Sequence, residues 1–66
     1  MTYRCEGTMR DGQSVVRYAS AQTPQSALTL FCETCRMECI DLAEARIYWG
    51  NTPRPNAKPV AAWPEG

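Results

Sequence analysis

The chain has 66 residues, which is enough for one domain with a thin hydrophobic core. Seven basic residues balance seven acidic ones and neither sign gathers in one segment, which argues against direct binding of nucleic acid. A hydrophobic fraction of 44% argues against disorder, and no apolar run approaches the roughly 18 residues of a membrane span.

Residues 2–20 are predicted to form a β-hairpin. Asp11-Gly12 is a strong signal for a two-residue turn, and such a turn pairs Glu6 with Arg17 and Cys5 with Tyr18. Because side chains alternate along a strand, this register sorts the hairpin into two faces. The inward face holds Tyr3, Cys5, Met9, Val16 and Tyr18, and the outward face holds Arg4, Glu6, Arg10, Gln13 and Arg17.

A helix is predicted over residues 24–37. Thr23 suits the N-cap, and Pro24 suits the first helical position because its φ is already helical and its missing N–H is not needed there. The residues that follow form an apolar stripe at helical spacing, which is expected to face the sheet: Leu28, Phe31, Cys32, Cys35 and Cys39.

Residues 41–49 fit either a strand or a second helix. Apolar Ala45, Ile47 and Trp49 alternate with Arg46 and Tyr48, which favours a strand at 44–49, since a hairpin needs a third strand to build a core. Four prolines among residues 51–66 predict an extended tail. The expected fold is therefore α+β, in the order ββαβ, with one helix packed on a small antiparallel sheet at 1–50 and a Pro-rich tail at 51–66.

The cysteines at 5, 32, 35 and 39 are open to three interpretations: buried structural thiols, zinc ligands or disulfides. The first residues carry no continuous apolar segment, so we expect a cytoplasmic protein with reduced cysteines. On a continuous helix about 10 Å of rise separates Cys32 from Cys39, so one zinc ion reaches both only if the helix ends near Arg36. We favour buried thiols and expect no cofactor.

Catalysis has little support in the sequence. The chain contains no histidine, the residue most often used as a general base. A redox cysteine is normally activated at a helix N-terminus, and Cys32 comes more than two turns after the start of the predicted helix. We therefore expect no enzyme, and we keep a small four-cysteine zinc module and a thiol redox protein as alternatives.

Candidate binding residues come from two surfaces. The apolar candidates are Leu30 and Met37, which lie off the core stripe of the helix, Tyr48, which faces outward if Trp49 is in the core, and Trp63 in the tail. The charged candidates are the arginines of the outward hairpin face: Arg4, Arg10 and Arg17.

One layout-level resemblance bears on function, over residues 8–28. It is carried by Arg10-Asp11-Gly12, Val15-Val16, the small residues Ala19 and Ala21, and Thr23-Pro24. This order of hairpin, helix and strand resembles some small anti-CRISPR proteins of bacteriophages. The resemblance implies an inhibitor that occludes a site on a protein or nucleoprotein complex. The expected function is protein binding, including inhibition of a bacterial defence (CRISPR-Cas) or other host complex.

Overall fold

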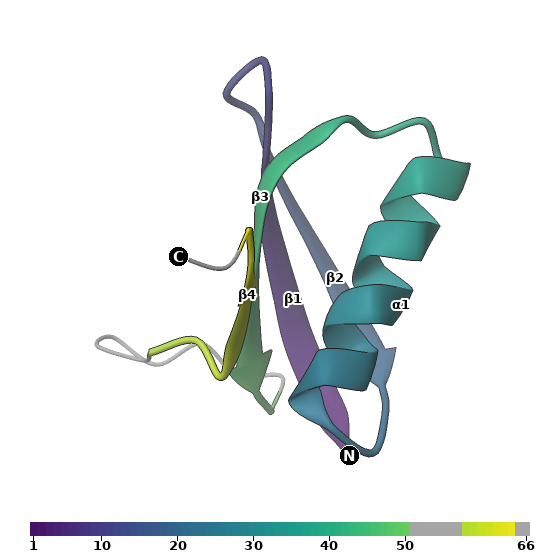
Figure 1. The fold of residues 1–66 in the computed structure, drawn as a ribbon, viewed down its shortest axis with the longest axis vertical. Coiled ribbons are helices and arrows are strands. Elements are labelled where there is room, and N and C mark those ends of the chain that lie inside the picture. The colour runs from purple at the N-terminus through teal and green to yellow at the C-terminus, as the bar shows by residue number, and fades with distance from the viewer. Residues whose placement is uncertain (51–57, 65–66) are drawn as a thin grey trace.

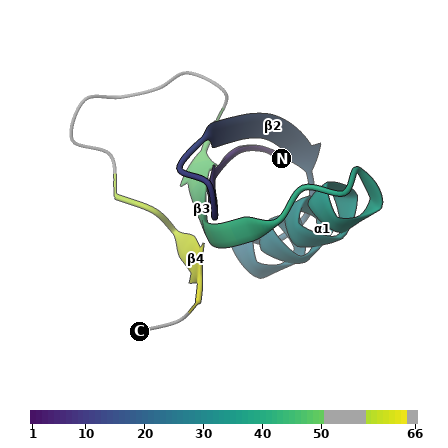
Figure 2. The same ribbon diagram turned by 90° about the horizontal axis from the view of Figure 1, so that it is seen from above.

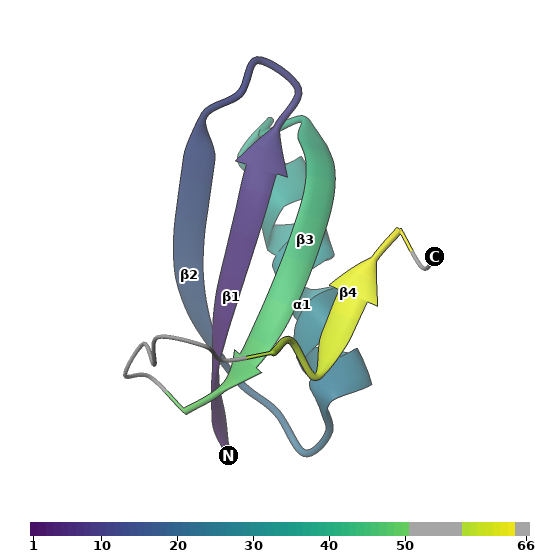
Figure 3. The ribbon, with the colours of Figure 1, turned by 90° about the vertical axis from the view of Figure 1, so that its left-hand side faces the viewer.

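The computed structural model describes residues 1–50 and 58–64. Its elements, in chain order, are β1 (Thr2–Met9), β2 (Ser14–Ser20), α1 (Pro24–Met37), β3 (Leu42–Trp49) and β4 (Ala61–Trp63). The strands form one antiparallel sheet in the order β2-β1-β3-β4, and α1 packs across one face of it (Figure 1; Figure 2). Within residues 1–50 and 58–64, the other face carries no helix (Figure 3). The predicted α+β class is confirmed.

Helix α1 has the predicted bounds, and its ends show why. Thr23 is extended, with φ −134° and ψ 156°, and its hydroxyl accepts a hydrogen bond from the Ser26 N–H at 3.1 Å. At the other end Cys39 has φ 60°, so the Ile40 N–H reaches the Cys35 carbonyl at 2.8 Å and closes the helix. No helix in the described ranges is long and apolar enough to cross a membrane.

The predicted register of the hairpin is wrong by one residue. Cys5 lies opposite Arg17, not Tyr18, and Glu6 lies opposite Val16, not Arg17. The loop has three residues, because the Met9 N–H bonds the Gln13 carbonyl at 2.7 Å and the Gly12 N–H bonds the Met9 carbonyl at 2.9 Å. A two-residue turn needs positive φ at both Asp11 and Gly12, and only Gly12 has it, at 93°.

In the observed register, the side chains of β2 point to the opposite faces from those predicted, whereas the side chains of β1 keep their predicted faces. Tyr3 and Cys5 are buried as expected, but Val15 takes the core position that was predicted for Val16. Val16 and Tyr18 are 44% and 55% exposed. Directly opposite residues share a face, so both side chains lie on the face that α1 leaves open.

The third strand is confirmed, and it begins at Leu42, two residues before the predicted start. The tail prediction needs correction, because Ala61–Trp63 adds a fourth strand at the edge of the sheet. Two prolines, Pro59 and Pro64, lie just outside this strand and take no part in its pairing. The rest of the predicted tail, residues 51–57 and 65–66, lies outside the described residues.

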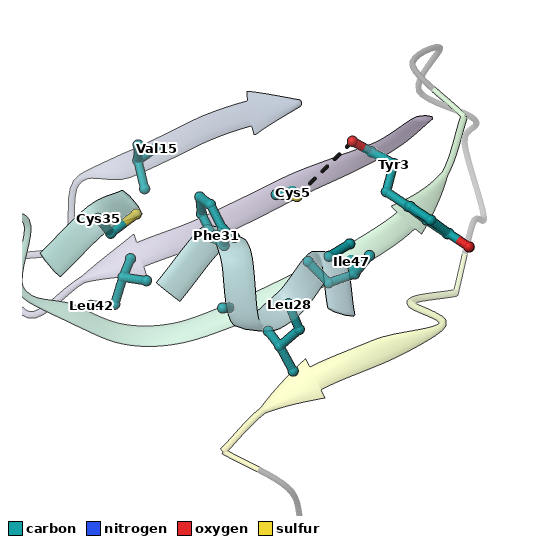
Figure 4. Close-up of a cluster of buried hydrophobic side chains, with 10 residues drawn as sticks. Tyr3, Cys5, Val15, Leu28, Phe31, Cys35, Leu42 and Ile47 are labelled. Atoms are coloured by element: carbon teal, nitrogen blue, oxygen red, sulfur yellow. Dashed lines mark hydrogen bonds between the residues drawn. The ribbon is translucent and has the colours of Figure 1, made fainter. Parts of the chain in front are cut away.

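The core fills the space between α1 and the sheet (Figure 4). Its buried residues are Tyr3, Cys5, Val15, Ala27, Leu28, Phe31, Cys35, Leu42, Ala45 and Ile47. Gly7 in β1 lets the layers approach: a Cβ there would lie 2.6 Å from Leu42 Cδ2 and 3.2 Å from Phe31 Cζ. The absence of a side chain at this position thus leaves room for Leu42 of β3 and Phe31 of α1 to pack over β1.

Candidate protein-binding site

A groove of about 480 Å³ runs between α1 and the β4 side of the sheet. The apolar residues along it are Leu28, Cys32, Ile40, Leu42 and Trp63, and the polar residues are Gln25, Thr29, Glu33, Arg36 and Asp41. Leu28 and Leu42 are core residues, so the groove opens directly onto the hydrophobic core. We refer to this feature as the α1–β4 groove.

Trp63 enters the groove because of its register in the sheet. It lies opposite Ala45, a buried residue beneath α1, and opposite residues place their side chains on the same face. The indole therefore lies on the helix side of the sheet and remains 43% exposed. Much of the apolar surface of Trp63 is therefore exposed to water beside an apolar groove.

The charges around the groove nearly balance. Glu33 and Asp41 are acidic and Arg36 is basic, while Asp41 is also paired with Arg10 in the hairpin loop at 3.0 Å. With Arg10 included, the described residues on and beside the groove carry two positive and two negative charges. Recognition in this groove would depend on apolar contact and shape more than on charge attraction.

The open face of the sheet has a different character. Arg4 lies in the middle of it, opposite Tyr18 on one side and Tyr48 on the other. Its guanidinium is 4.9 Å from the centre of the Tyr48 ring and pairs with Glu6 at 2.7 Å. Only 13% of the Arg4 side chain is exposed, and its buried Nε has no hydrogen-bond partner among the described residues, so Arg4 offers little accessible charge to a partner.

The predicted arginine surface is not one surface. Arg4 lies on the open face, and Arg10 lies in the hairpin loop. Arg17 lies on the helix side of β2, where it pairs with Glu38 at 3.2 Å. The one-residue register error caused this prediction, because it assigned Arg17 to the same face as Arg4.

The predicted apolar contacts are also dispersed. Trp63 lines the α1–β4 groove, whereas Leu30 is exposed on the β2 side of α1 and Met37 is 84% exposed at the end of the helix. Tyr48 is half-buried on the open face beneath Arg4. Trp49, expected in the core, is half exposed, with its ring centre 5.1 Å from that of Tyr3.

The four cysteines are free thiols in different surroundings. Cys5 and Cys35 are buried and Cys32 is half-buried in the groove, whereas Cys39, predicted to face inward, is exposed. Burial, reinforced by the nearby Cys35, raises the pKa of Cys5 to about 11, and burial also raises the pKa values of Cys32 and Cys35. These groups are held as neutral thiols, which are weak nucleophiles and weak metal ligands.

Metal binding has no ligand cluster in the described part of the chain. Across residues 1–50 and 58–64, no three side chains of His, Cys, Asp or Glu lie close enough to share a metal ion. The geometry of these residues therefore gives no support to the zinc-module alternative.

The sequence did not reveal the groove, because its two sides come from distant parts of the chain. One signal was available: Val60 to Trp63 is a short apolar run between Pro59 and Pro64, as expected of a short edge strand. Comparisons with protein-family models, with curated proteins and with solved structures find no match to this chain.

Proposed function

We propose that this chain is a small non-catalytic protein-binding domain, and that the α1–β4 groove receives apolar side chains of its partner. The observation that carries the proposal is the groove itself, in which a half-exposed Trp63 stands beside core residues such as Leu28. Tryptophan is enriched among the residues that dominate binding energy at protein interfaces.

The dimensions of the groove support this proposal. Its volume of about 480 Å³ leaves room for side chains of a partner. The polar residues around it, among them Gln25 and Thr29, are exposed on α1 and surround the apolar floor. An apolar centre within a polar rim is the usual organisation of a protein interface. The near balance of charge favours a partner segment that is apolar and carries little net charge.

The state of the thiols supports a role without catalysis. Cys32 is the thiol within the groove, and its raised pKa keeps it protonated near neutral pH. Asp41, one of the two acids that line the groove, is engaged by Arg10. Neither group is placed as an activated nucleophile or base, so both are better suited to packing and solvation.

A narrower form of the proposal concerns the identity of the partner. This form is motivated only by the layout-level resemblance of residues 8–28 to small phage anti-CRISPR proteins. We propose a bacterial defence (CRISPR-Cas) or other host complex as the partner class, with inhibition by steric occlusion. The test is whether the purified chain, added in stoichiometric amounts, inhibits such a complex.

The groove is tested by blocking it without removing a core contact. Thr29→Arg places a large charged side chain on the groove, and Met37→Arg places the same side chain on α1 outside it. A partner is first isolated by affinity capture, and its dissociation constant is then measured for both variants. We expect Thr29→Arg to weaken binding at least about thirtyfold, the loss of one strong interface contact. Met37→Arg is expected to leave binding within about twofold of the original chain.

The control for folding is a thermal melt of each variant. If both variants fold and Met37→Arg weakens binding as much as Thr29→Arg does, or if neither variant changes it, the groove is not the binding site.

A further inference from the structure

Strand β2 is a free edge of the sheet, since β1 is its only neighbour among the described residues. Met1 and Ala21 exchange two backbone hydrogen bonds, at 2.9 and 3.2 Å, which fixes the alternation of bonded pairs along the hairpin. Val15, Arg17 and Ala19 therefore direct their backbone groups toward β1. The outward backbone groups belong to the four residues that alternate with them: Ser14, Val16, Tyr18 and Ser20.

These outward residues are placed symmetrically about Arg17. Val16 and Tyr18 lie one residue from it, and Ser14 and Ser20 lie three residues from it. Consider a second β2 strand that runs antiparallel to the first, with the two Arg17 residues opposite each other. In this register every outward N–H of one strand lies opposite an outward C=O of the other. Seven regular residues with no proline form an edge that another chain can extend.

Apolar side chains flank this edge on both faces of the sheet. Val16 and Tyr18 are exposed on the open face, and Leu30 of α1 is 44% exposed on the helix face. Leu30 lines a hollow of about 100 Å³ together with Arg17 and Ala19 of β2. A strand added to β2 would cover apolar surface on both sides.

We propose that β2 pairs antiparallel with β2 of a second copy of this chain, about a two-fold axis at Arg17, and joins the two sheets into one. In this register Val16 lies opposite Tyr18 of the other copy, so a β-branched residue meets an aromatic one at two symmetric places. A second copy fits because the outward pattern, serine at both ends and apolar residues between, is complementary to itself. Pairing through β2 leaves the α1–β4 groove at the opposite side of the sheet free.

Arg17 is the one charge on this edge, and its contacts make the pairing possible. Two guanidinium groups meeting across the axis would repel each other, but each is held at 3.2 Å by Glu38 of its own chain, the C-cap residue of α1. Arg17 also donates to the outward Val16 carbonyl at 2.9 Å. A carbonyl oxygen has two lone pairs, so Val16 can accept this bond and one from the second copy.

The first experiment measures mass against concentration by sedimentation equilibrium. The full chain is expected to rise from its monomer mass of 7.4 kDa toward twice that value as concentration increases. Val16→Pro removes an outward N–H that β1 does not use, and is expected to stay monomeric over a range in which the original chain dimerises. Val16→Thr keeps the N–H and is the matched control, expected to retain dimerisation. A monomer at all concentrations up to millimolar would overturn the proposal, as would a dimer unaffected by Val16→Pro.

The second experiment tests the register and does not depend on the proline variant. In a Cys39→Ser background, which removes the exposed native thiol, Arg17→Cys brings two thiols together across the axis. Opposite residues at a non-bonded position have Cα atoms about 4.5 Å apart, within the range that a disulfide spans. We expect Arg17→Cys to form a covalent dimer on mild oxidation at least tenfold faster than Ser14→Cys. Equal rates for the two variants would contradict the register.

Discussion

Replacing Gly7 by alanine tests the packing of α1 on the sheet. In most strands this change stabilises a protein by about 0.4–1 kcal/mol, because alanine restricts the unfolded chain more than glycine does. Here the new Cβ would lie 2.6 Å from Leu42 Cδ2, 3.1 Å from Val15 Cγ1 and 3.2 Å from Phe31 Cζ. Carbon atoms in contact are normally about 3.5–4.0 Å apart, so at least one of these side chains, or the helix itself, must move.

The expected result is a net loss of stability. Overpacking of this kind costs about 1–3 kcal/mol, which exceeds the gain from the unfolded state. We expect Gly7→Ala to lower the free energy of unfolding by about 1–2 kcal/mol. For a chain of this size each kcal/mol lowers the melting temperature by about 4–8 °C. Thermal unfolding followed by circular dichroism measures this change.

A second substitution shows whether steric overlap is the cause. Leu42→Val removes the Cδ2 atom that the new Cβ would approach most closely. The double variant Gly7→Ala, Leu42→Val should therefore lose less stability than the sum of the two single variants. A Gly7→Ala protein that melts at or above the temperature of the original chain would refute the role given to Gly7.

Three further predictions concern the cysteines. Cys39→Gly should raise the free energy of unfolding by about 1 kcal/mol, because Cys39 is exposed and has a positive φ that glycine adopts without strain. An unchanged or lower melting temperature would contradict this prediction. In the folded protein a thiol reagent should modify Cys39 first and Cys32 more slowly, whereas Cys5 and Cys35 should react only on unfolding; mass spectrometry of the modified peptides gives the order. Stability should fall as pH rises from about 9 to 11, because Cys5 stays protonated in the folded state while the unfolded state, with a pKa of 9.0, loses the proton. Urea titrations at pH 8 and 10 measure this loss, which should be smaller in Cys5→Ala.

Local signals explain why much of the fold was predictable from the sequence. Thr23 and Pro24 fix the start of α1 through the geometry of a helix cap, which involves only neighbouring residues. The alternation in β3 likewise predicts the burial of Ala45 and Ile47, although it fails for Trp49 at the end of the strand. The class and the order of the first four elements follow from such signals.

The errors arose where several structures share one local signal. Asp11-Gly12 suits both a two-residue and a three-residue loop, and the choice depends on the conformation of Asp11. Its carboxylate accepts a bond from the Gln13 N–H at 3.0 Å, which supports the longer loop. That single difference moved Val16 and Tyr18 from the expected core to the open face.

The candidate site was less predictable than the fold. Trp63 was named as a contact residue, but its neighbours in the groove come from α1 and from the segment that leads into β3, and only the pairing of β4 with β3 brings them together. No local pattern encodes that pairing. The role of Gly7 could not be predicted either, because it depends on the side chains that pack around this position, and those come from three other elements: Val15, Phe31 and Leu42.

The most direct test of the proposed binding function is nuclear magnetic resonance of the isotope-labelled full chain, titrated with its unlabelled partner. If the α1–β4 groove is the site, the largest shift changes should fall on the methyl groups of Leu28, Ile40 and Leu42 and on the indole N–H of Trp63. Changes confined to the open face, around Tyr18 and Tyr48, with the groove signals unmoved, would contradict the central claim.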